Sequence, residues 1–448
     1  MAAAEAEATH ALLGAGGFGV VVQPALAFPN TVPDPENAPN NVTKIMFRRT
    51  GYNRVVKVLP TVKSLLKNAG HRTTPSATVH TFNALPASLQ SNIRKKRGFQ
   101  SVEPDADIYT LRMPYLGIDV HELVEEMKQG GKEIRNRPVL VVLDQVVKLI
   151  SQINTLVENG YIHGDVRDTN IMVHPLTGVL TLIDFDWLKP KDEFIDSYAK
   201  DNAFGFYSNP PESLFTGKRG AFVDYNGFLP PKIVSYVSDF YRQFTFCRDN
   251  YIGDIPKDTP EDEIESRCQQ VLGEAIVEAI NNKEFFDELG ITSLKQDVWK
   301  TFDGFGLAWT LLTFFTYTYT SESILGDIDL FQRDLSTLIT NEGVPYTEEQ
   351  VKACANAIRR MIEEVLAPLS DFEYRLRIPI GEALDRATSI RDELAAVFAD
   401  GVGAAAAAAA AAAVAEPVVK AVGGAGVGRR TRNRGHRRNH RTRRQRRN

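Results

Sequence analysis

Cysteine is scarce in this chain, with three residues among 448, at Cys247, Cys268 and Cys354. Their wide spacing matches neither a zinc-binding pattern nor a disulfide framework, which favours a reducing compartment. The first residues lack the basic start, apolar core and small-residue cleavage site of a secretory signal, so we do not expect secretion. The most apolar stretch, Leu307 to Phe315, is far too short to cross a bilayer, and we expect no membrane partner.

Acidic residues are missing from two segments. Residues Lys44 to Val102 contain 12 Lys or Arg and no Asp or Glu. The last 20 residues contain 11 Arg and no acid, so the rest of the chain carries a net charge of −15 although the whole carries −4. A block of like charges repels itself and stays disordered until it meets a polyanion. We therefore expect sequence-independent nucleic-acid binding through Arg429–Arg447, while a nuclear import signal or a solubilising end explains the same residues equally well.

The character of the sequence changes near residue 117 and again near residue 400. Before residue 117, short β-branched runs indicate strands at Val20 to Gln23, Val42 to Phe47 and Ile108 to Met113. After it, helical spacing dominates, most clearly from Val139 to Val157. Past residue 400, ten consecutive Ala residues precede the Arg-rich end, which is typical of a linker and a tail. The pattern predicts an α+β fold.

A glycine-rich segment, Gly14-Ala15-Gly16-Gly17-Phe18-Gly19, precedes the first of these predicted strands. A loop that covers phosphates needs glycine because side chains would keep the backbone away from the phosphate oxygens. A dinucleotide-binding loop is disfavoured, since a helix would have to follow it. We name Gly14, Gly16, Gly17, Gly19 and, on the strand, Val21 as candidate nucleotide-binding residues. Lys44, on the next predicted strand, is the candidate for contacting the α- and β-phosphates.

The most specific motif is His163-Gly164-Asp165-Val166-Arg167-Asp168-Thr169-Asn170. Transfer of a phosphoryl group needs a carboxylate to orient and deprotonate the attacking hydroxyl, and an oxygen to hold a metal ion. Asp165 and Asn170 supply both from one loop, and Arg167 can offset charge on the γ-phosphate. Asp184, in Ile183-Asp184-Phe185-Asp186, follows a predicted hairpin formed by Ile171 to Val173 and Val179 to Ile183. We assign Asn170 and Asp184 as the candidate magnesium ligands.

These motifs resemble the catalytic loop and the Asp-Phe-Gly segment of the eukaryotic protein-kinase superfamily. The run Val20-Val21-Val22-Gln23-Pro24 and the long stretch between Glu212 and Asp303 are similar to the divergent serine/threonine kinases of large nucleocytoplasmic DNA viruses. Met113-Pro114-Tyr115-Leu116-Gly117 is similar to the hinge that holds adenine, so Met113 and Tyr115 join the candidates. Pro210-Pro211-Glu212 is similar to the end of an activation segment, and Arg377 to the residue that pairs with that glutamate. Asp303 resembles the helix residue that braces the catalytic loop.

The resemblance implies a two-lobed kinase-like fold, with an N-lobe at residues 1–116 and a helical C-lobe at 117–400. The C-lobe would contain a helical insertion at about 213–300, followed by the linker and tail at 401–448. It also implies ATP and Mg²⁺ as cofactors, a serine/threonine protein substrate, and residence in the cytoplasm or nucleus of a host cell or in a virus particle.

The sequence departs from the family pattern at three informative places. The acid-free segment lacks the helix glutamate that normally pairs with the strand lysine, so either another acid, of which Glu103 is nearest in sequence, or ATP itself must order Lys44. Gly164 replaces an arginine that receives a phosphate, so we expect no dependence on phosphorylation at Ser197, Tyr198 or Ser208. Asp186 replaces a glycine and is expected to stiffen its segment.

Three functions are therefore compared. The first is a serine/threonine protein kinase, and the intact Asp165, Asn170 and Asp184 favour it. The second is a small-molecule kinase on the same scaffold, because His-Gly-Asp and Asp-Phe-Asp also occur in aminoglycoside- and choline-kinase-like relatives. The third is a pseudokinase that acts as a binding protein tethered to nucleic acid, which the missing helix glutamate favours.

Overall fold

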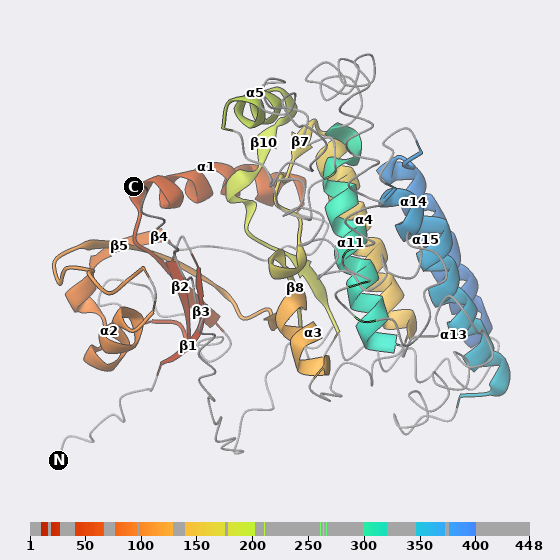
Figure 1. Ribbon diagram of the computed structural model, residues 1–448, viewed down its shortest axis with the longest axis horizontal. Coiled ribbons are helices and arrows are strands. Elements are labelled where there is room, and N and C mark those ends of the chain that lie inside the picture. Colours follow the sequence, from red (N-terminus) through yellow and green to blue (C-terminus); the bar gives the residue numbers. More distant parts are fainter. Residues whose placement is uncertain are drawn as a thin grey trace, which may run out of the picture.

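A computed structural model gives the structure of this chain. It describes residues 10–16, 19–26, 41–66, 77–96, 98–128, 139–174, 178–201, 299–319, 346–371 and 376–399, and the single residues 210, 260, 263 and 266. The predicted insertion at 213–300 and the linker and tail at 401–448 lie outside these residues, apart from the few named. Within them the fold is α+β, with an antiparallel sheet on one side and a helical part on the other (Figure 1).

The larger sheet has five strands among the described residues, in the order β1-β2-β3-β5-β4, and every neighbouring pair is antiparallel. The strands are β1 (Ala11–Gly16), β2 (Gly19–Gln23), β3 (Asn41–Met46), β4 (Ala77–Thr81) and β5 (Asp107–Pro114). Along β2, Val20 and Val22 are buried and Val21 is half-buried. This period of two is what a strand with one buried face requires.

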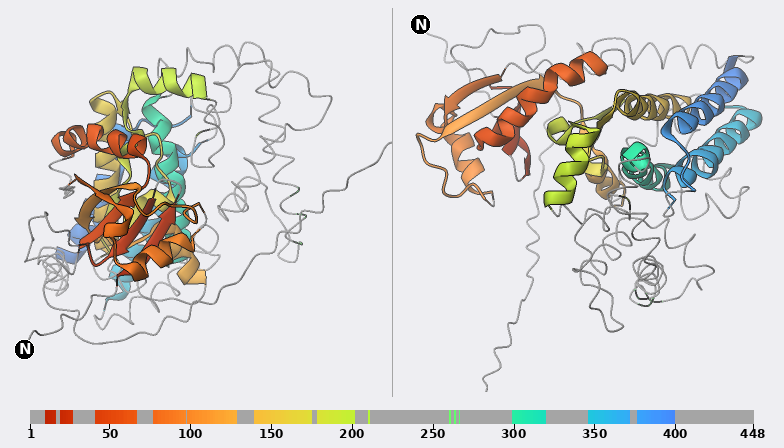
Figure 2. Two further views of the ribbon diagram at one scale, coloured as in Figure 1. Left: turned by 90° about the vertical axis from the view of Figure 1, so that its left-hand side faces the viewer. Right: turned by 90° about the horizontal axis from the view of Figure 1, so that it is seen from above.

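Helices cover this sheet at different places. α2 (Ala87–Arg94) contributes Leu89 and Ile93 to a core with Phe82 and the buried valines of β2. α1 (Arg49–Leu65) follows β3 and packs on the segment around residues 185–187, which belongs to the helical side of the molecule (Figure 2). α1 therefore links the sheet to the segment that contains Asp184.

The chain leaves the sheet at the end of β5 and enters the helical part through β6 (Ile118–Asp119) and α3 (Val120–Lys128). The longer helices of this part are α4 (Val139–Glu158), α11 (Trp299–Tyr319), α13 (Glu348–Arg360) and α15 (Ile380–Ala399). A π-helical turn, η9 (Met361–Leu366), and the short α14 (Ala367–Leu369) continue α13. Two small sheets complete it: β6-β8-β9, with β8 (Ile171–Val173) and β9 (Leu180–Leu182), and the pair β7 (Tyr161–Ile162) with β10 (Lys189–Pro190). α5 (Lys191–Asp201) follows β10.

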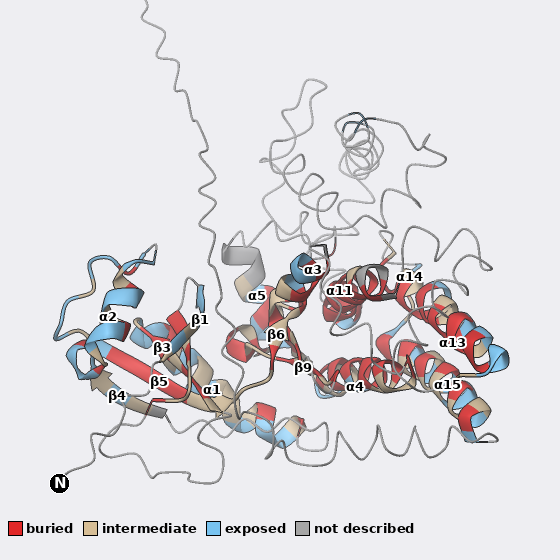
Figure 3. Cartoon of the chain, turned by 90° about the horizontal axis from the view of Figure 1, so that it is seen from below, coloured by how far each residue is buried: buried red, intermediate tan, exposed pale blue. Residues whose placement is uncertain are grey.

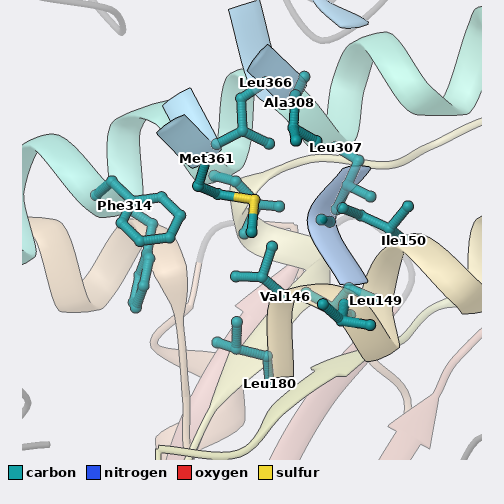
Figure 4. Close-up of a cluster of buried hydrophobic side chains, with 14 of the residues drawn as sticks. Val146, Leu149, Ile150, Leu180, Leu307, Ala308, Phe314, Met361 and Leu366 are labelled. Carbon is teal, nitrogen blue, oxygen red and sulfur yellow. The ribbon is translucent and has the colours of Figure 1, made fainter. Parts of the chain in front are cut away.

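The core of the helical part lies around α4. Val146, Leu149 and Ile150 of α4 pack with Leu307 of α11 and Met361 of η9 (Figure 4). Figure 3 shows the buried faces of α4, α11, α13 and α15 turned toward one another. α4 is the one helix among the described residues whose length and composition would also let it cross a membrane, and its apolar residues are buried in this core.

The predicted elements are confirmed where the structure describes them. The three predicted strands are β2, β3 and β5, the helix at Val139 is α4, and the predicted hairpin is β8–β9. One prediction needs correction: most of the glycine-rich segment is not a loop. Gly14 and Gly16 lie in strand β1, because the backbone there pairs with β2 through five residue pairs.

Candidate functional site

Asp303 holds the backbone at the start of the 163–170 loop. The Asp303 Oδ2 atom accepts a hydrogen bond of 2.6 Å from the His163 backbone N–H, and Oδ1 accepts one of 2.9 Å from the Gly164 N–H. Asp303 lies on α11, 140 residues after His163, and is buried. Burial raises the pKa of Asp303 to about 6, although the two backbone hydrogen bonds act to lower it. The geometry confirms the predicted bracing role of this residue.

His163 is buried, and both of its ring nitrogens make hydrogen bonds. The Asp165 backbone N–H donates to His163 Nδ1 at 3.3 Å, so Nδ1 is an acceptor. The proton is therefore on Nε2, which donates to the Ile183 carbonyl at 3.1 Å. The ring also packs against Phe185, with ring centroids 4.7 Å apart. His163 thus joins the loop to the segment that contains Asp184.

Asp165, Asn170 and Arg167 are brought together within this loop. Asn170 Nδ2 donates to Asp165 Oδ2 and to the Asp165 carbonyl, both at 2.8 Å, and Arg167 Nε lies 3.2 Å from Asp165 Oδ1. Burial raises the pKa of Asp165, while the Arg167 charge and the Asn170 hydrogen bond act to lower it. Because both Asn170 bonds to Asp165 use Nδ2, the amide oxygen Oδ1 is turned away from Asp165.

Lys44 and Asp184 form an ion pair, with Nζ 2.8 Å from Oδ1. Both side chains are partly buried, at 19% and 25% exposed. Asp184 has φ 62° and ψ 59°, and it is the one non-glycine residue with positive φ among those the structure describes. Such a conformation costs on the order of 1–3 kcal/mol and is found most often at functional sites. Lys44 thus has another acid, Asp184, as its partner, as one of the two expected alternatives had it, whereas Glu103, the acid nearest in sequence, is exposed.

The Asp165 cluster and the Asp184 ion pair are neighbours. The Ile183 backbone N–H donates to the Asn170 carbonyl at 2.9 Å, which ties the residue before Asp184 to the end of the loop. The negative charge of Asp184 also acts on Asp165, where it adds to the raised pKa. The structure therefore gathers Lys44, Asp165, Asn170 and Asp184 from three separate segments of the chain.

Asp186 is a further carboxylate at this place, within η5 (Phe185–Trp187). It is buried, with 7% of the residue exposed. Burial is the largest cause that raises the pKa of Asp186 to about 7, followed by the charge of Asp184, while the charges of Lys44 and Arg54 lower it. Arg54 lies on α1, and the sequence analysis did not identify it, because nothing in a lone exposed arginine indicates a buried neighbour.

The glycine-rich segment is only partly accounted for. Gly16 pairs with Gly19 at the end of the β1–β2 hairpin, and Gly17 lies outside the described residues. A Cβ atom on Gly19 would lie 2.1 Å from the Ile45 carbonyl oxygen, so packing of β2 on β3 requires glycine there. A Cβ on Gly14 would have no heavy atom within 4 Å. The close packing of β2 on β3 therefore gives a structural reason for glycine at position 19, which the sequence analysis assigned to phosphate binding.

Val21 and the residues at the end of β5 lie on the same sheet as Lys44. Val21 is the direct cross-strand partner of Lys44, and Met113 is paired with Val42 two residues before Lys44. Because directly opposed residues of antiparallel strands project from the same face, Val21 and Lys44 share a face of the sheet. Tyr115 follows β5 in the segment that leads to the helical part.

Gly117 fixes the position of that connecting segment. Its φ is +105°, and a Cβ atom there would lie 2.0 Å from the Val173 carbonyl oxygen. Ile118 then pairs with Val173. Since β8 begins at the residue after Asn170, the connection from β5 is anchored on the strand that follows the 163–170 loop.

The oxygen atoms of Asn170 and Asp184 fit a magnesium ion. Mg²⁺ prefers oxygen ligands and is commonly held by one or two carboxylates together with substrate phosphates, and not by a complete protein cage. The part of the chain that the structure describes contains no group of three or more His, Cys, Asp or Glu residues arranged to hold a metal. One carboxylate and one amide oxygen fit a metal ion that arrives bound to phosphate.

The remaining predicted residues lie further along the helical part. Arg377 is buried, donates to the Asp371 carbonyl and lies over the Phe305 ring, 4.8 Å from its centroid. Its expected partner Glu212 lies outside the described residues.

Sequence reasoning also missed a contact between His121 and Asp168. His121 Nδ1 lies 3.1 Å from Asp168 Oδ2, across 47 residues, and this contact raises the pKa of His121. No sequence signal connects His121 to the 163–170 loop. Comparison with protein-family models gives no match to this chain, and comparison with curated proteins gives no similar sequence.

Proposed function

We propose that this chain is an ATP- and Mg²⁺-dependent phosphotransferase of the protein-kinase type that acts on a serine or threonine hydroxyl. The observation that carries the proposal is the convergence of Lys44, Asp165, Asn170 and Asp184, which includes an ion pair between residues 140 positions apart. These are the residue types that positioning and charge stabilisation of a phosphoryl group require.

The fold supports the same proposal. A small antiparallel sheet and a larger helical part are joined through residues 115–117, and the gathered residues come from both. We infer a two-lobed kinase-like arrangement, in which the connecting segment with Met113 and Tyr115 borders the adenine. Val21, beside Lys44 on the sheet, would cover the nucleotide from the same face.

Asp165 is assigned as the general base. A base works best when its pKa approaches the working pH, and burial raises the pKa of Asp165. Asn170 keeps one carboxylate oxygen of Asp165 in place, and Arg167 lies beside the other. Asp165 would orient the substrate hydroxyl and accept its proton, and Arg167 would offset charge that develops on the transferred group.

Lys44, Asn170 and Asp184 are assigned to the phosphates and the metal ion. Mg²⁺ bound to ATP supplies charge neutralisation of the phosphate oxygens. For this, Asp184 would turn its carboxylate to the metal, and Lys44 would move its ammonium group from Asp184 to the α- and β-phosphates. The 2.8 Å ion pair keeps both side chains ordered near the positions where they act.

The two alternative functions, a pseudokinase and a small-molecule kinase, can be distinguished by their substrate and by whether they bind and use ATP. The pseudokinase alternative rests on the missing helix glutamate, and Asp184 is the acid that pairs with Lys44 in this structure. A small-molecule kinase keeps the support of Gly164 and Asp186, so the test includes an aminoglycoside and choline beside casein and the chain itself.

The test measures transfer of labelled γ-phosphate by the full chain with Mg²⁺ and ATP. Asp165→Asn should lower the rate by roughly 10²- to 10⁴-fold without lowering the melting temperature. Asp385→Asn is the matched control, because Asp385 is an exposed acid on α15. If Asp165→Asn retains full activity, the assignment of the base is wrong. If the wild type transfers nothing to any acceptor while Mg²⁺–ATP raises its melting temperature, the protein is a nucleotide-binding protein and not a kinase.

A further inference from the structure

Helix α1 has an exposed face that carries cations and no acid. Arg49, Lys57 and Lys63 are all exposed. With about 3.6 residues per turn, these three positions lie within an arc of about 120° around the helix axis. Val58 and Val62 lie on the opposite side, where α1 packs against the core of the helical part. Arg49, Lys57 and Lys63 thus form the basic face of α1, on its solvent side.

The cations of this basic face have no partner within the part of the chain that the structure describes. There, the side chains of Arg49, Lys57 and Lys63 make no ion pair and no hydrogen bond. The stretch from Lys44 to Val102 contains no acid that could reach them along the chain. The helix dipole favours Lys63 in the last turn, but it disfavours Arg49 in the first turn by about 0.3–1 kcal/mol. Helix stability therefore does not explain the whole set.

Helix α2 belongs to the same acid-free stretch, and two of its cations have local explanations. Arg94 donates to the Val102 carbonyl and lies over the Phe82 ring. Lys95 follows the last residue of α2, where the helix dipole favours a cation. α2 also lies at a different place on the sheet from α1 (Figure 1). The basic face of α1 is thus the feature that local structure leaves unexplained.

The residues between these cations indicate which kind of partner the face suits. Asn53, Pro60 and Ser64 are exposed on the same side of α1, and Val56 is the one large apolar side chain there, at 36% exposed. The centre of a protein–protein interface needs aromatic or apolar anchors, which this face lacks. A helix that lies in a membrane surface must insert an apolar face, and that of α1 is buried in the fold.

A nucleic-acid duplex supplies the complementary charge over the length of this face. Arg49 to Lys63 span about 21 Å of helix, and a duplex carries one negative charge per about 1.7 Å, so about a dozen phosphates lie alongside. Without its last 20 residues the chain carries a net charge of −15, which repels nucleic acid. Contact with a phosphate backbone is therefore confined to local basic surfaces such as this one.

We propose that the basic face of α1 binds the phosphate backbone of a nucleic-acid duplex without regard to its sequence. Each cation that neutralises a phosphate releases a counterion, so the binding weakens as the salt concentration rises. This surface is separate from the Arg-rich tail. It is also independent of phosphate transfer, so its failure and the failure of the proposed function are distinct results.

The test uses the full chain with the arginines of residues 429–448 changed to glutamine, so that the tail does not mask α1. Fluorescence anisotropy measures its affinity for a labelled DNA duplex of random sequence between about 50 and 200 mM salt. A plot of the logarithm of the binding constant against the logarithm of the salt concentration gives the slope. Adding Arg49→Gln, Lys57→Gln and Lys63→Gln should reduce the magnitude of this slope by about 3.

Two control variants separate the basic face from net charge. Lys95→Gln, Lys96→Gln and Lys352→Gln together remove the same charge at exposed positions outside α1, and they should leave the slope unchanged. Exchanging Lys and Arg at the three positions of the basic face keeps its charge and should keep the slope. All of these positions are exposed, so the melting temperature should change little.

The outcomes that overturn the proposal are specific. It is wrong if the parent chain does not bind the duplex, or if the three glutamines on α1 leave the slope unchanged. An equal reduction of the slope in the Lys95, Lys96 and Lys352 variant would show an effect of net charge alone. If the α1 variant instead loses binding to phosphatidylserine vesicles and keeps its affinity for DNA, the face binds a membrane surface and not nucleic acid.

Discussion

Lys44 Nζ lies 2.8 Å from Asp184 Oδ1, and this ion pair joins strand β3 of the sheet to the turn after β9 in the helical part. Asp184 reaches it through a left-handed backbone conformation, which turns its side chain in a direction that an extended strand would not allow. This one ion pair thus holds Asp184 in its strained backbone conformation and orders Lys44, for which α1 offers no glutamate.

The Lys44–Asp184 pair should contribute to stability as a unit. We expect Lys44→Met and Asp184→Asn to have non-additive effects, with a coupling free energy of about 1 kcal/mol, because both side chains are less than one third exposed. Urea unfolding of the wild type, both single variants and the double variant measures this coupling. Strict additivity would show that the ion pair contributes nothing to the fold.

Asp303 should make stability depend on pH in an unusual direction. Its folded pKa of about 6 lies above the ordinary carboxyl value of 3.8, so the folded chain holds this proton more tightly than the unfolded chain. The stabilising contribution of the protonated group is therefore complete below about pH 4 and is lost as the pH rises through about 6.

Asp303→Asn removes this titration but keeps a side chain of the same size. Between pH 4 and pH 7 the unfolding free energy of the wild type should fall on the order of 3 kcal/mol more than that of the variant. At pH 4 the variant should be the less stable of the two, because its amide cannot accept both backbone hydrogen bonds. Urea unfolding of both chains across this range checks the prediction. Parallel pH profiles would contradict it.

Gly164 should not tolerate a side chain. Its φ is +78°, and a Cβ atom would lie 2.5 Å from Phe194 Cε2. Gly160 offers a matched control, since its φ is +71° but a Cβ there would meet no heavy atom within 4 Å. Gly160→Ala should cost about 1–2 kcal/mol for the backbone conformation alone, and Gly164→Ala should cost more because Phe194 must also move. Equal losses of unfolding free energy in the two variants, measured by thermal unfolding, would show that Phe194 can move aside without an energetic cost.

The same geometry bears on phosphorylation. Phe194 lies beside Gly164, and the Ser197 hydroxyl donates to the Phe194 carbonyl and accepts from Lys189 Nζ, each within 2.9 Å. We expect phosphatase treatment and Ser197→Ala to leave transfer activity within about twofold, since Gly164 gives the 163–170 loop no cation to pair with a phosphate, and Lys189 lies outside that loop. A large loss after phosphatase treatment would contradict this prediction; Ser208 lies outside the described residues.

The Arg-rich tail carries a separate proposal, nucleic-acid binding through Arg429–Arg447. We consider the case in which all 11 arginines contact phosphates of a DNA duplex. A plot of the logarithm of the binding constant against the logarithm of the salt concentration should then have a slope of about −10. Changing these arginines to glutamine should abolish most of the slope, and changing them to lysine should preserve it. An unchanged slope in the glutamine variant would assign DNA binding to another part of the chain.

Local pattern was sufficient to predict several elements and some residues that the structure brings together. Alternation indicated β2, helical spacing indicated α4, and the Asp165–Asn170 spacing identified two residues that do lie in contact. These features depend on residues only a few positions apart, so they can be recognised in the sequence alone. Nothing local distinguishes Arg54 from other exposed arginines, or His121 from other surface histidines.

The sequence by itself determined the α+β class, the loop that carries Asp165 and Asn170, and the absence of any acid on α1. Only the tertiary structure decided that Asp184 is the partner of Lys44 and that Asp186 is buried where α1 meets η5. The physical reason is that a carboxylate takes its partner from whichever donors and cations packing brings near it, and packing joins Lys44 to an acid 140 positions away.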